Sequence, residues 1–123
     1  MFGEVYTIKF VVPNLGDVKA ELQRIKGPHL TERIVSSLPI TTRCLKRGDI
    51  LVIPINVLYS VEKPTHSGNR GDIIYEPNSK SLIIPLQSTS FDQKVAKIGK
   101  IINNFIIFET LKGSVGVRIE REE

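Results

Sequence analysis

Short runs of β-branched and aromatic residues, each closed by a turn, dominate the chain from Ile40 onward. Turns are expected at Lys46–Asp49, Pro77–Lys80 and Lys112–Gly113, where glycine, proline or asparagine interrupts the apolar runs. The runs themselves predict strands at 40–45, 50–55, 72–75, 81–86, 95–102, 105–108 and 115–119. About eight strands of this length and spacing are typical of a closed β-barrel, because closure removes the exposed edges of an open sheet.

The N-terminal segment predicts a hairpin that belongs to the same barrel. Every second residue from Tyr6 to Val12 is apolar, so Glu4–Val12 is expected to be a strand with one face on the core. Pro13–Gly16 then predicts a tight turn. Asp17–Ile25 fits either a helical stripe or an alternating strand, and the preceding turn favours the strand, which would complete the hairpin.

One short helix is expected between the hairpin and the later strands. His29–Leu38 has an apolar face at helical spacing, with Thr31 as the N-cap and Pro39 preventing continuation. We expect this helix to pack over one end of the barrel. Two polar segments, Glu62–Arg70 and Gln87–Asp92, are expected to be loops, and the first is expected to be long and mobile.

Length and composition define the broad class of protein. The 123 residues suit one domain, expected at 1–123, and can bury a core without a metal or a disulfide. Cys44 is the only cysteine, which points to a reducing compartment, and its place in an expected strand favours a half-buried hydrophobe over a reactive thiol. The sequence shows no signal peptide and no membrane-spanning run, so we expect a cytoplasmic protein. The isoleucine and valine content would also suit a thermophile.

The net charge of +4 raises the question of nucleic-acid binding. The densest group of cations is Lys94, Lys97 and Lys100, and the other basic residues are scattered along the chain. A surface that follows a phosphate backbone usually gathers its cations on one face, with aromatic residues nearby. Nucleic acid is therefore not the expected partner, and a basic RNA-associated barrel is kept only as a third interpretation.

The clearest internal feature is a repeated tetrapeptide. Arg-Gly-Asp-Ile occurs at Arg47–Ile50 and again at Arg70–Ile73, and each copy opens a β-branched run that ends in proline. Glycine permits a sharp entry, aspartate can bond the backbone two residues on, and the apolar run forms the strand. The repeat is interpreted as two strand entries and not as an integrin-type recognition tripeptide, since the chain shows no secretion signal.

The second copy is also part of a longer pattern. In order along the chain come Leu38-Pro39, Gly48-Asp49, Gly71–Pro77, the apolar run Leu82–Leu86, and Gly99–Ile101. This order resembles that of the small prokaryotic cyclophilin-like proteins, in which an N-terminal hairpin and a short helix ending in "L-P" precede "G-D", "G-D-I-x-Y-x-P", an apolar strand and "G-K-I". The resemblance covers roughly residues 4–119. It implies a mainly β, closed cyclophilin-like barrel of about eight strands with one or two short helices.

The chain departs from this pattern at two places. The first "G-D" segment continues with Ile50 and Leu51, where the family often has an acid and an aromatic residue. The second has Glu76, Pro77 and Asn78 where the family usually has an aromatic residue followed by Pro-Gly. A pocket lined by these positions would therefore differ in its chemistry from that of the family.

Cyclophilins isomerise X-Pro bonds with an arginine, a glutamine, a histidine and several aromatic residues around an apolar pocket. The contiguous "F-H-R" and "F-x-x-Q" segments of those enzymes are absent from this sequence, and so is tryptophan. Isolated catalytic candidates are Arg43 on an expected strand and Gln87 after the apolar strand. The simpler interpretation of these two is a solvated strand arginine and a loop-capping amide.

Four residues are candidates for ligand binding, namely Tyr59, Tyr75, Glu76 and Phe91. Aromatic residues in such places are more often part of the core or its rim, and an acid on an apolar strand is more often an outward edge residue. The two histidines have no ligand partner at a useful spacing, and no Gly-rich phosphate loop or nucleophile elbow occurs. Neither a metal nor a cofactor is therefore expected.

These observations favour a cyclophilin-like protein that binds a small ligand or peptide without efficient catalysis, in a pocket near Glu62–Arg70 and Gln87–Asp92. The alternative is a divergent peptidyl-prolyl isomerase that uses Arg43 and Gln87. Homo-oligomerisation is also considered, because Phe105–Phe108 is very apolar, although a buried strand would explain that run equally well.

Overall fold

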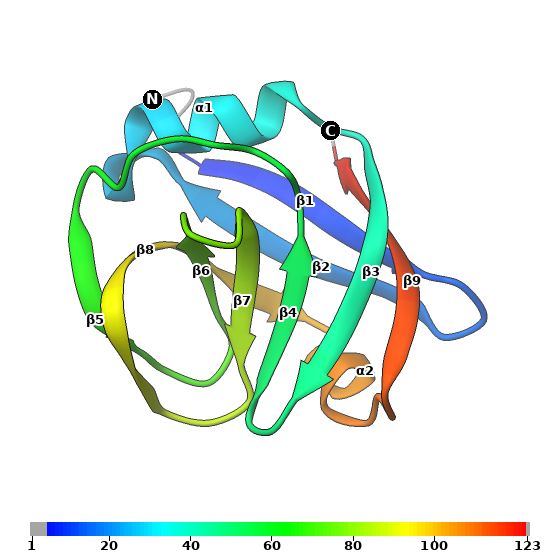
Figure 1. Cartoon of the computed structure of the whole chain (residues 1–123). Helices are drawn as coiled ribbons and strands as arrows, with labels where there is room; N and C mark the ends of the chain where they lie inside the picture. Colours follow the sequence, from blue (N-terminus) through cyan, green and yellow to red (C-terminus); the bar gives the residue numbers. More distant parts are fainter. Residues whose placement is uncertain (1–4, 123) are drawn as a thin grey trace.

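The computed structural model of the chain describes residues 5–122, so Glu4, the expected start of the first strand, lies outside the described residues. Strands β1 (Val5–Val12) and β2 (Gly16–Gln23) form the expected hairpin (Figure 1). Its turn ends at Gly16, which has a φ of 121°. The strand interpretation of the ambiguous segment is therefore confirmed as far as Gln23, and the chain then makes a short 3-10 helix, η1 (Arg24–Lys26).

Eight antiparallel strands close into a barrel, in the order β2-β1-β9-β3-β4-β7-β6-β8, with β8 pairing back onto β2. The later strands of the ring are β3 (Ile40–Arg47), β4 (Ile50–Pro54), β6 (Asp72–Glu76), β7 (Ser81–Pro85), β8 (Thr89–Asn103) and β9 (Ser114–Arg121). A ninth strand, β5 (Pro64–Gly68), pairs with β8 alone. The expected closed, mainly β barrel is confirmed.

Closure of the ring depends on a glycine. Gly99 of β8 lies opposite Leu22 of β2, and a Cβ atom at residue 99 would collide with the backbone oxygen of Glu21. The two strands approach too closely here for any side chain. Gly99 is the glycine of the "G-K-I" segment in the sequence pattern.

Helix α1 (Pro28–Ser36) packs over one end of the barrel, as expected, and buries Leu30 and Ile34 (Figure 1). Its expected N-cap is wrong, because the helix begins at Pro28, which is a favourable first helical residue. Thr31 is buried inside the helix, and its Oγ1 has no hydrogen-bond partner within residues 5–122.

The opposite end of the barrel is covered by helix α2 (Phe105–Glu109), where the sequence predicted a strand. That prediction is wrong, because Asn104 takes a left-handed conformation with φ 61° and ends β8. The helix then turns Phe108 inward, where it meets the ring of Phe10 edge-on with centroids 5.4 Å apart. Ile106 is left 61% exposed, and the expectation of homo-oligomers stays a prediction.

Both expected loops contain strand residues. Glu62–Arg70 includes β5, and Gln87–Asp92 includes the start of β8, so these two loop predictions are wrong. The two segments pair with each other, and Ser67 lies opposite Ser90. Their polar composition gives no sign of this strand pairing, because the partners are distant in sequence. The segment without regular hydrogen-bonded structure is 55–63 instead.

The core fills the barrel and extends onto one outer face of it. Ile73 and Tyr75 of β6 are fully buried in the main core, while Ile74 joins a second cluster with Ile83 and Val95. Cys44 is fully buried rather than half-buried, and this burial raises the pKa of its thiol to about 12. No helix within residues 5–122 has the length and apolar character needed to cross a membrane.

Candidate functional site

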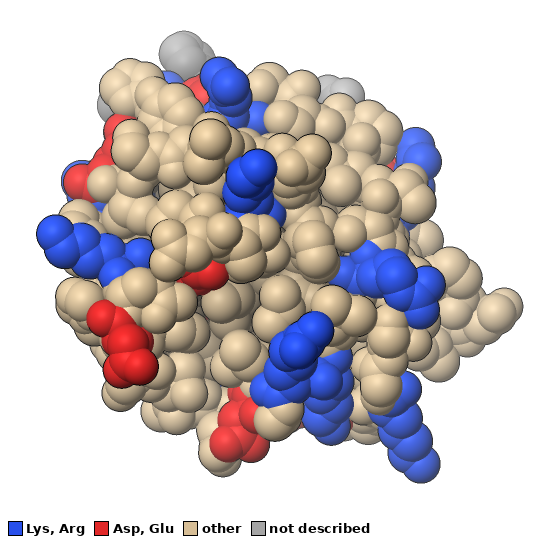
Figure 2. Space-filling view, in the orientation of Figure 1, with Lys and Arg blue, Asp and Glu red and all other residues tan. Residues whose placement is uncertain are grey.

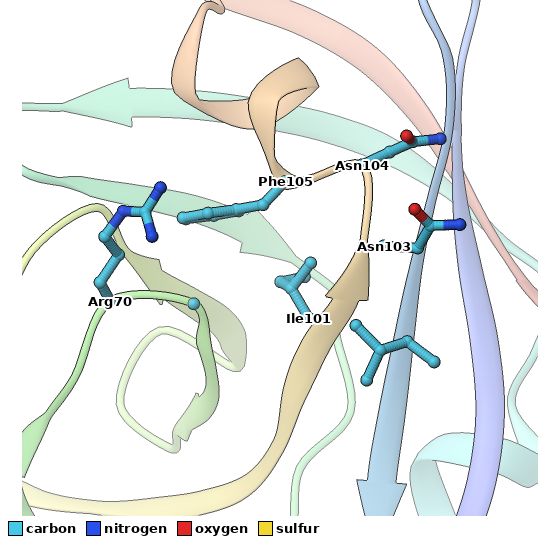
Figure 3. A pocket seen from close by; sticks show the side chains of 7 residues that line it. Arg70, Ile101, Asn103, Asn104 and Phe105 are labelled. Atoms are coloured by element: carbon cyan, nitrogen blue, oxygen red, sulfur yellow. The ribbon is translucent and has the colours of Figure 1, made fainter.

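A cleft of about 330 Å³ opens between the turn that leads into β6 and the end of β8 (Figure 3). This volume is at the lower end of the roughly 300–1,000 Å³ of small-molecule pockets, so it suits a small occupant. The lining combines one cationic, two amide and several apolar side chains: Arg70, Gly71, Ile101, Ile102, Asn103, Asn104 and Phe105.

Arg70 is held in place from two sides. Its guanidinium carbon lies 4.7 Å from the centroid of the Phe105 ring, and Figure 3 shows the two groups pointing toward one another. Its Nε donates a hydrogen bond to Oε2 of Glu109 at 2.9 Å, and Nη2 donates to the same oxygen. Stacking and a charge-assisted pair together restrict an arginine that is still 56% exposed.

The backbone around Arg70 explains why the side chain reaches the cleft. Gly71 has a φ of 86°, which turns the chain sharply into β6. The Gly71 oxygen accepts a hydrogen bond from the Ile101 amide at 2.7 Å, and this bond fixes the turn against β8. Arg70 and Phe105 are distant in sequence, and the hydrogen bond between Ile101 and Gly71 brings their segments together.

The amide side chains of the cleft differ in their freedom. Asn104 donates from Nδ2 to the Asp17 oxygen at 3.0 Å, which ties the end of β8 to β2. Asn103 is exposed and makes no side-chain hydrogen bond within residues 5–122. Beside it, Ile102 is 45% exposed. The cleft thus offers a cation, a free amide and apolar surface, which is a set suited to binding.

The two catalytic candidates from the sequence do not meet. Arg43 is exposed on β3 and donates from Nε to Ser114 Oγ at 2.9 Å, while Gln87 donates to Asp49 Oδ2 at 2.6 Å. Arg47 and Pro85 lie at the same level of the sheet, because both are paired with Ile50. Arg43 lies four residues to one side of this level, and Gln87 lies two residues to the other. At about 3.3 Å per residue they are separated by roughly 20 Å along the strands.

Of the aromatic candidates, Tyr59 and Tyr75 do come together. Tyr75 is fully buried, and its hydroxyl donates to the Val57 oxygen at 2.5 Å and accepts from the Tyr59 amide at 3.2 Å. The pKa of the Tyr75 hydroxyl is raised, mainly because the side chain is buried away from water. Tyr75 thus anchors the segment 55–63 to the barrel wall. Its assignment and that of Tyr59 as ligand-binding residues stay predictions.

The other two candidates have local partners. Glu76 is 5% exposed rather than on an outward edge, and its carboxylate accepts hydrogen bonds from the Asn78 amide at 2.6 Å and from the amide and hydroxyl of Ser79. It therefore caps the turn between β6 and β7. Phe91 is half-buried and packs against the outer apolar cluster. Neither lines the cleft of Arg70.

A second, shallower cleft of about 300 Å³ lies between α1 and the segment 55–63, and Tyr59 lines it with His29, Glu32, Arg33 and Ser36. Glu62 accepts hydrogen bonds from the Leu30 amide and from Nδ1 of His29, one of the residues of this cleft, each at 2.8 Å. Desolvation opposes ionisation of Glu62, but these hydrogen bonds outweigh it and lower its pKa. This cleft is a weaker candidate, because the Arg33 guanidinium lies 5.9 Å from the centroid of the Tyr59 ring, farther than the 4.7 Å that separates Arg70 from the Phe105 ring.

Charge is unevenly spread on the face shown in Figure 2. Blue side chains gather over the lower part of β3 and the start of β9, whereas the red ones are fewer there. The exposed cations of these segments are Arg43, Lys46, Arg47 and Lys112. Within residues 5–122, no group of three or more histidine, cysteine or acidic side chains is arranged to hold a metal ion.

The eight-stranded ring with a helix over one end is a cyclophilin-like barrel. The chain is similar to a hypothetical protein of Archaeoglobus fulgidus known from a solution structure, with 19% identity, a TM-score of 0.79, and 98% of this chain and 97% of that chain covered. It is also similar to a cyclophilin-type peptidyl-prolyl cis-trans isomerase of Cryptosporidium parvum, with 16% identity, a TM-score of 0.71, and 97% and 98% covered.

A third similar structure is that of McbB in complex with tryptophan, with 16% identity and a TM-score of 0.77. The match covers 94% of this chain but only 44% of the McbB chain. No protein-family model matches the sequence, and no curated protein matches it. The likeness to solved structures therefore shows the fold.

Sequence reasoning singled out Arg70 as part of a strand entry and missed its role in the cleft. It also missed Phe105 and Glu109, which were assigned to an expected strand and its end. No local spacing could have found them, because Arg70 and Glu109 are 39 residues apart and meet only after α2 has formed. The one available signal was the repeat itself, since it marked Arg70 as a residue at a turn.

Proposed function

We propose that the chain is a non-catalytic binding protein that holds a small, partly apolar ligand or a short peptide in the cleft of Arg70 and Phe105. The observation that carries the proposal is the ordered guanidinium over an aromatic ring, at the mouth of a concave surface with exposed apolar groups. Pockets that bind small molecules combine apolar surface with a few fixed polar groups, and this cleft places the fixed guanidinium of Arg70 beside isoleucine side chains and an aromatic ring.

The comparisons add a precedent for the fold. McbB, whose structure is similar over 44% of its own length, was solved in complex with tryptophan. A ligand with an apolar body and polar ends would also suit the cleft of this chain, with its isoleucine side chains, its aromatic ring and its free amide. The sequence predicted a pocket near Glu62–Arg70, and of that segment only Arg70 lines the cleft.

The test is a titration of isotope-labelled protein with indole, L-tryptophan and N-acetyl-L-phenylalaninamide, followed by amide chemical shifts. We expect at least one compound to shift the signals of Gly71, Ile102 and Phe105. Arg70→Met should abolish or weaken the shifts, and Arg47→Met, which changes the matching arginine of the other repeat copy, should leave them intact. Shifts that are absent for all three compounds, or that survive in Arg70→Met, contradict the proposal.

A divergent peptidyl-prolyl isomerase is the enzymatic alternative. It shares the fold of the Cryptosporidium parvum neighbour, but the two candidate residues Arg43 and Gln87 lie far apart in this chain. A proline-peptide assay decides between the two functions. Turnover above the uncatalysed rate that disappears in Arg43→Ala would favour the isomerase, and a rate equal to the uncatalysed one would favour binding alone.

RNA association is a second candidate, favoured by the exposed cations of β3 and the segment before β9 (Figure 2). Binding to a phosphate backbone would weaken steeply with salt, because each neutralised phosphate releases counterions. A single-stranded RNA titration at two salt concentrations, with Arg43→Gln/Arg47→Gln as the variant, tests it. An RNA affinity that changes neither with salt nor with the two substitutions would exclude this surface as the RNA-binding site.

A further inference from the structure

The Glu109 carboxylate uses only part of the hydrogen-bonding capacity of Arg70. A guanidinium has five N–H donors in a fixed plane. Glu109 accepts from Nε and from one N–H of Nη2, both through its Oε2 atom. Nη1 has no hydrogen-bond partner within residues 5–122. The end of the guanidinium formed by Nη1 and the second N–H of Nη2 is therefore free.

The free end of this guanidinium fits one kind of acceptor well. Two parallel N–H donors match the two oxygens of a carboxylate, which is the bidentate geometry that distinguishes arginine from lysine. Phe105 supports one face of the plane and Glu109 fixes its opposite edge, so little side-chain freedom remains to be lost on binding. The arrangement is preorganised although the arginine is largely exposed.

The charge of the site limits the charge of its occupant. Among residues 5–122, Arg70 is the only charged residue that lines the cleft, and its positive charge is already paired with Glu109. A singly charged anion would share the guanidinium with Glu109, whereas a phosphate dianion would face the Glu109 carboxylate with twice the repulsion. A monoanionic carboxylate is the better match.

We propose that the ligand of this cleft carries a terminal carboxylate, which binds end-on to Nη1 and Nη2 of Arg70, and an apolar group, which lies against Phe105 and the exposed Ile102. The chemical class is an N-blocked amino acid or the C-terminal residue of a peptide. This inference rests on the proposed binding function and adds the ligand class to it. Glu109 then acts as a positioning residue for Arg70 and is not displaced.

The test compares two molecules that differ in one group, N-acetyl-L-phenylalanine and its primary amide, by amide chemical shifts and calorimetry. We expect the acid to bind at the cleft about tenfold more tightly than the amide, as expected for a charge-assisted bidentate pair. Arg70→Met should remove this preference, and Arg47→Met should keep it. Arg70→Lys, which keeps the charge but not the two parallel donors, should lose most of it.

The outcomes separate the two proposals. Equal affinity of acid and amide at the cleft would overturn the carboxylate and leave ligand binding intact. No shift with either compound, nor with those of the first titration, would overturn both. If inorganic phosphate shifts the same signals at the same concentration as the acid, the site binds anions in general and the proposed preference for a carboxylate is overturned. A preference retained in Arg70→Lys would show that charge, and not bidentate geometry, selects the ligand.

Discussion

The two Arg-Gly-Asp-Ile copies have the same four residues and lie at the same end of the barrel, yet their surroundings differ. The first leads into β4 and the second into β6, on either side of β7. Both contact the end of that strand, since the Leu86 amide donates to the Asp49 oxygen at 2.8 Å and the Gly71 amide donates to the Pro85 oxygen at 3.0 Å.

The first copy is an exposed hairpin tip, and the second is built into the molecule. Arg47, Gly48 and Asp49 are exposed, whereas Gly71 and Asp72 are buried. The reason is topological, because β3 and β4 pair with each other, while the strand before the second copy, β5, pairs with β8. The repeated residues thus determine the local turn. The strands that pair around each copy determine whether its side chains lie in the core, in a cleft or on the surface.

The largest expected difference lies at the isoleucines. Ile73 is fully buried in the main core, so Ile73→Ala should lower the free energy of unfolding by about 3 kcal/mol. Ile50 is half-buried beside the outer cluster, and Ile50→Ala should cost about 1 kcal/mol. Urea denaturation of both variants measures this difference, and equal losses would contradict the assigned burial.

The aspartates should differ next. Asp72 accepts a hydrogen bond from the Asn69 amide at 2.7 Å and pairs with Lys97 at 3.4 Å, so Asp72→Ala should cost about 2 kcal/mol of unfolding free energy. Asp49→Ala, at the exposed tip, should stay within about 0.5 kcal/mol. Asp72→Asn can still accept from Asn69 and serves as the control. If it is no more stable than the alanine variant, the hydrogen bond to Asn69 is not the stabilising contact.

The glycines test what the copies share. Gly48 has a φ of 62° and Gly71 a φ of 86°, and apart from the glycine and its two chain neighbours no described atom lies within 4 Å of the place where a Cβ would stand at either position. Alanine should therefore cost about 1–2 kcal/mol at either position, through backbone strain alone. Thermal unfolding with Gly48→Asn as a control, which tolerates left-handed geometry better, checks this. A much larger loss at Gly71 would mean that burial, and not backbone geometry, dominates there.

The arginines should show the smallest effect on stability. Arg70→Met removes an exposed ion pair and a cation–π contact, which together should cost about 1 kcal/mol or less. Arg47→Met should change the free energy of unfolding by about 0.5 kcal/mol or less. Chemical denaturation at low and at 1 M salt separates the two, because salt should reduce the loss in Arg70→Met. A loss that salt does not change would point to packing instead of charge.

The barrel could be predicted from the sequence because its evidence is local. Alternation in β1, the β-branched runs of β4, β6 and β7, and the turns between them each appear within a few residues. Segments whose structure depends on distant partners were not predictable. Phe105–Glu109 has strand-forming residues, yet Asn104 and the contact of Phe108 with Phe10 make it a helix. β5 is polar and exists through its pairing with β8.

The candidate site was predictable only in part, for the same reason. The sequence drew attention to the turn at Arg70, but the partners of that arginine come from α2, which propensity assigns to the wrong structure. Tyr75 shows the converse. Its place in the motif suggested a pocket residue, and the fold uses its hydroxyl to hold the backbone of Val57 and Tyr59.

The contact between Gly99 and the backbone of Glu21 has a consequence for relatives of this chain. The pairing of β2 with β8 is one of those that complete the ring, and at residue 99 it leaves room for a hydrogen atom only. Any chain that closes the ring in the same register must keep glycine at the position of residue 99, while outward positions nearby are free to vary. This single position could sort true relatives from chains that share the short motifs alone, even where overall identity has fallen below the level at which sequences can be aligned.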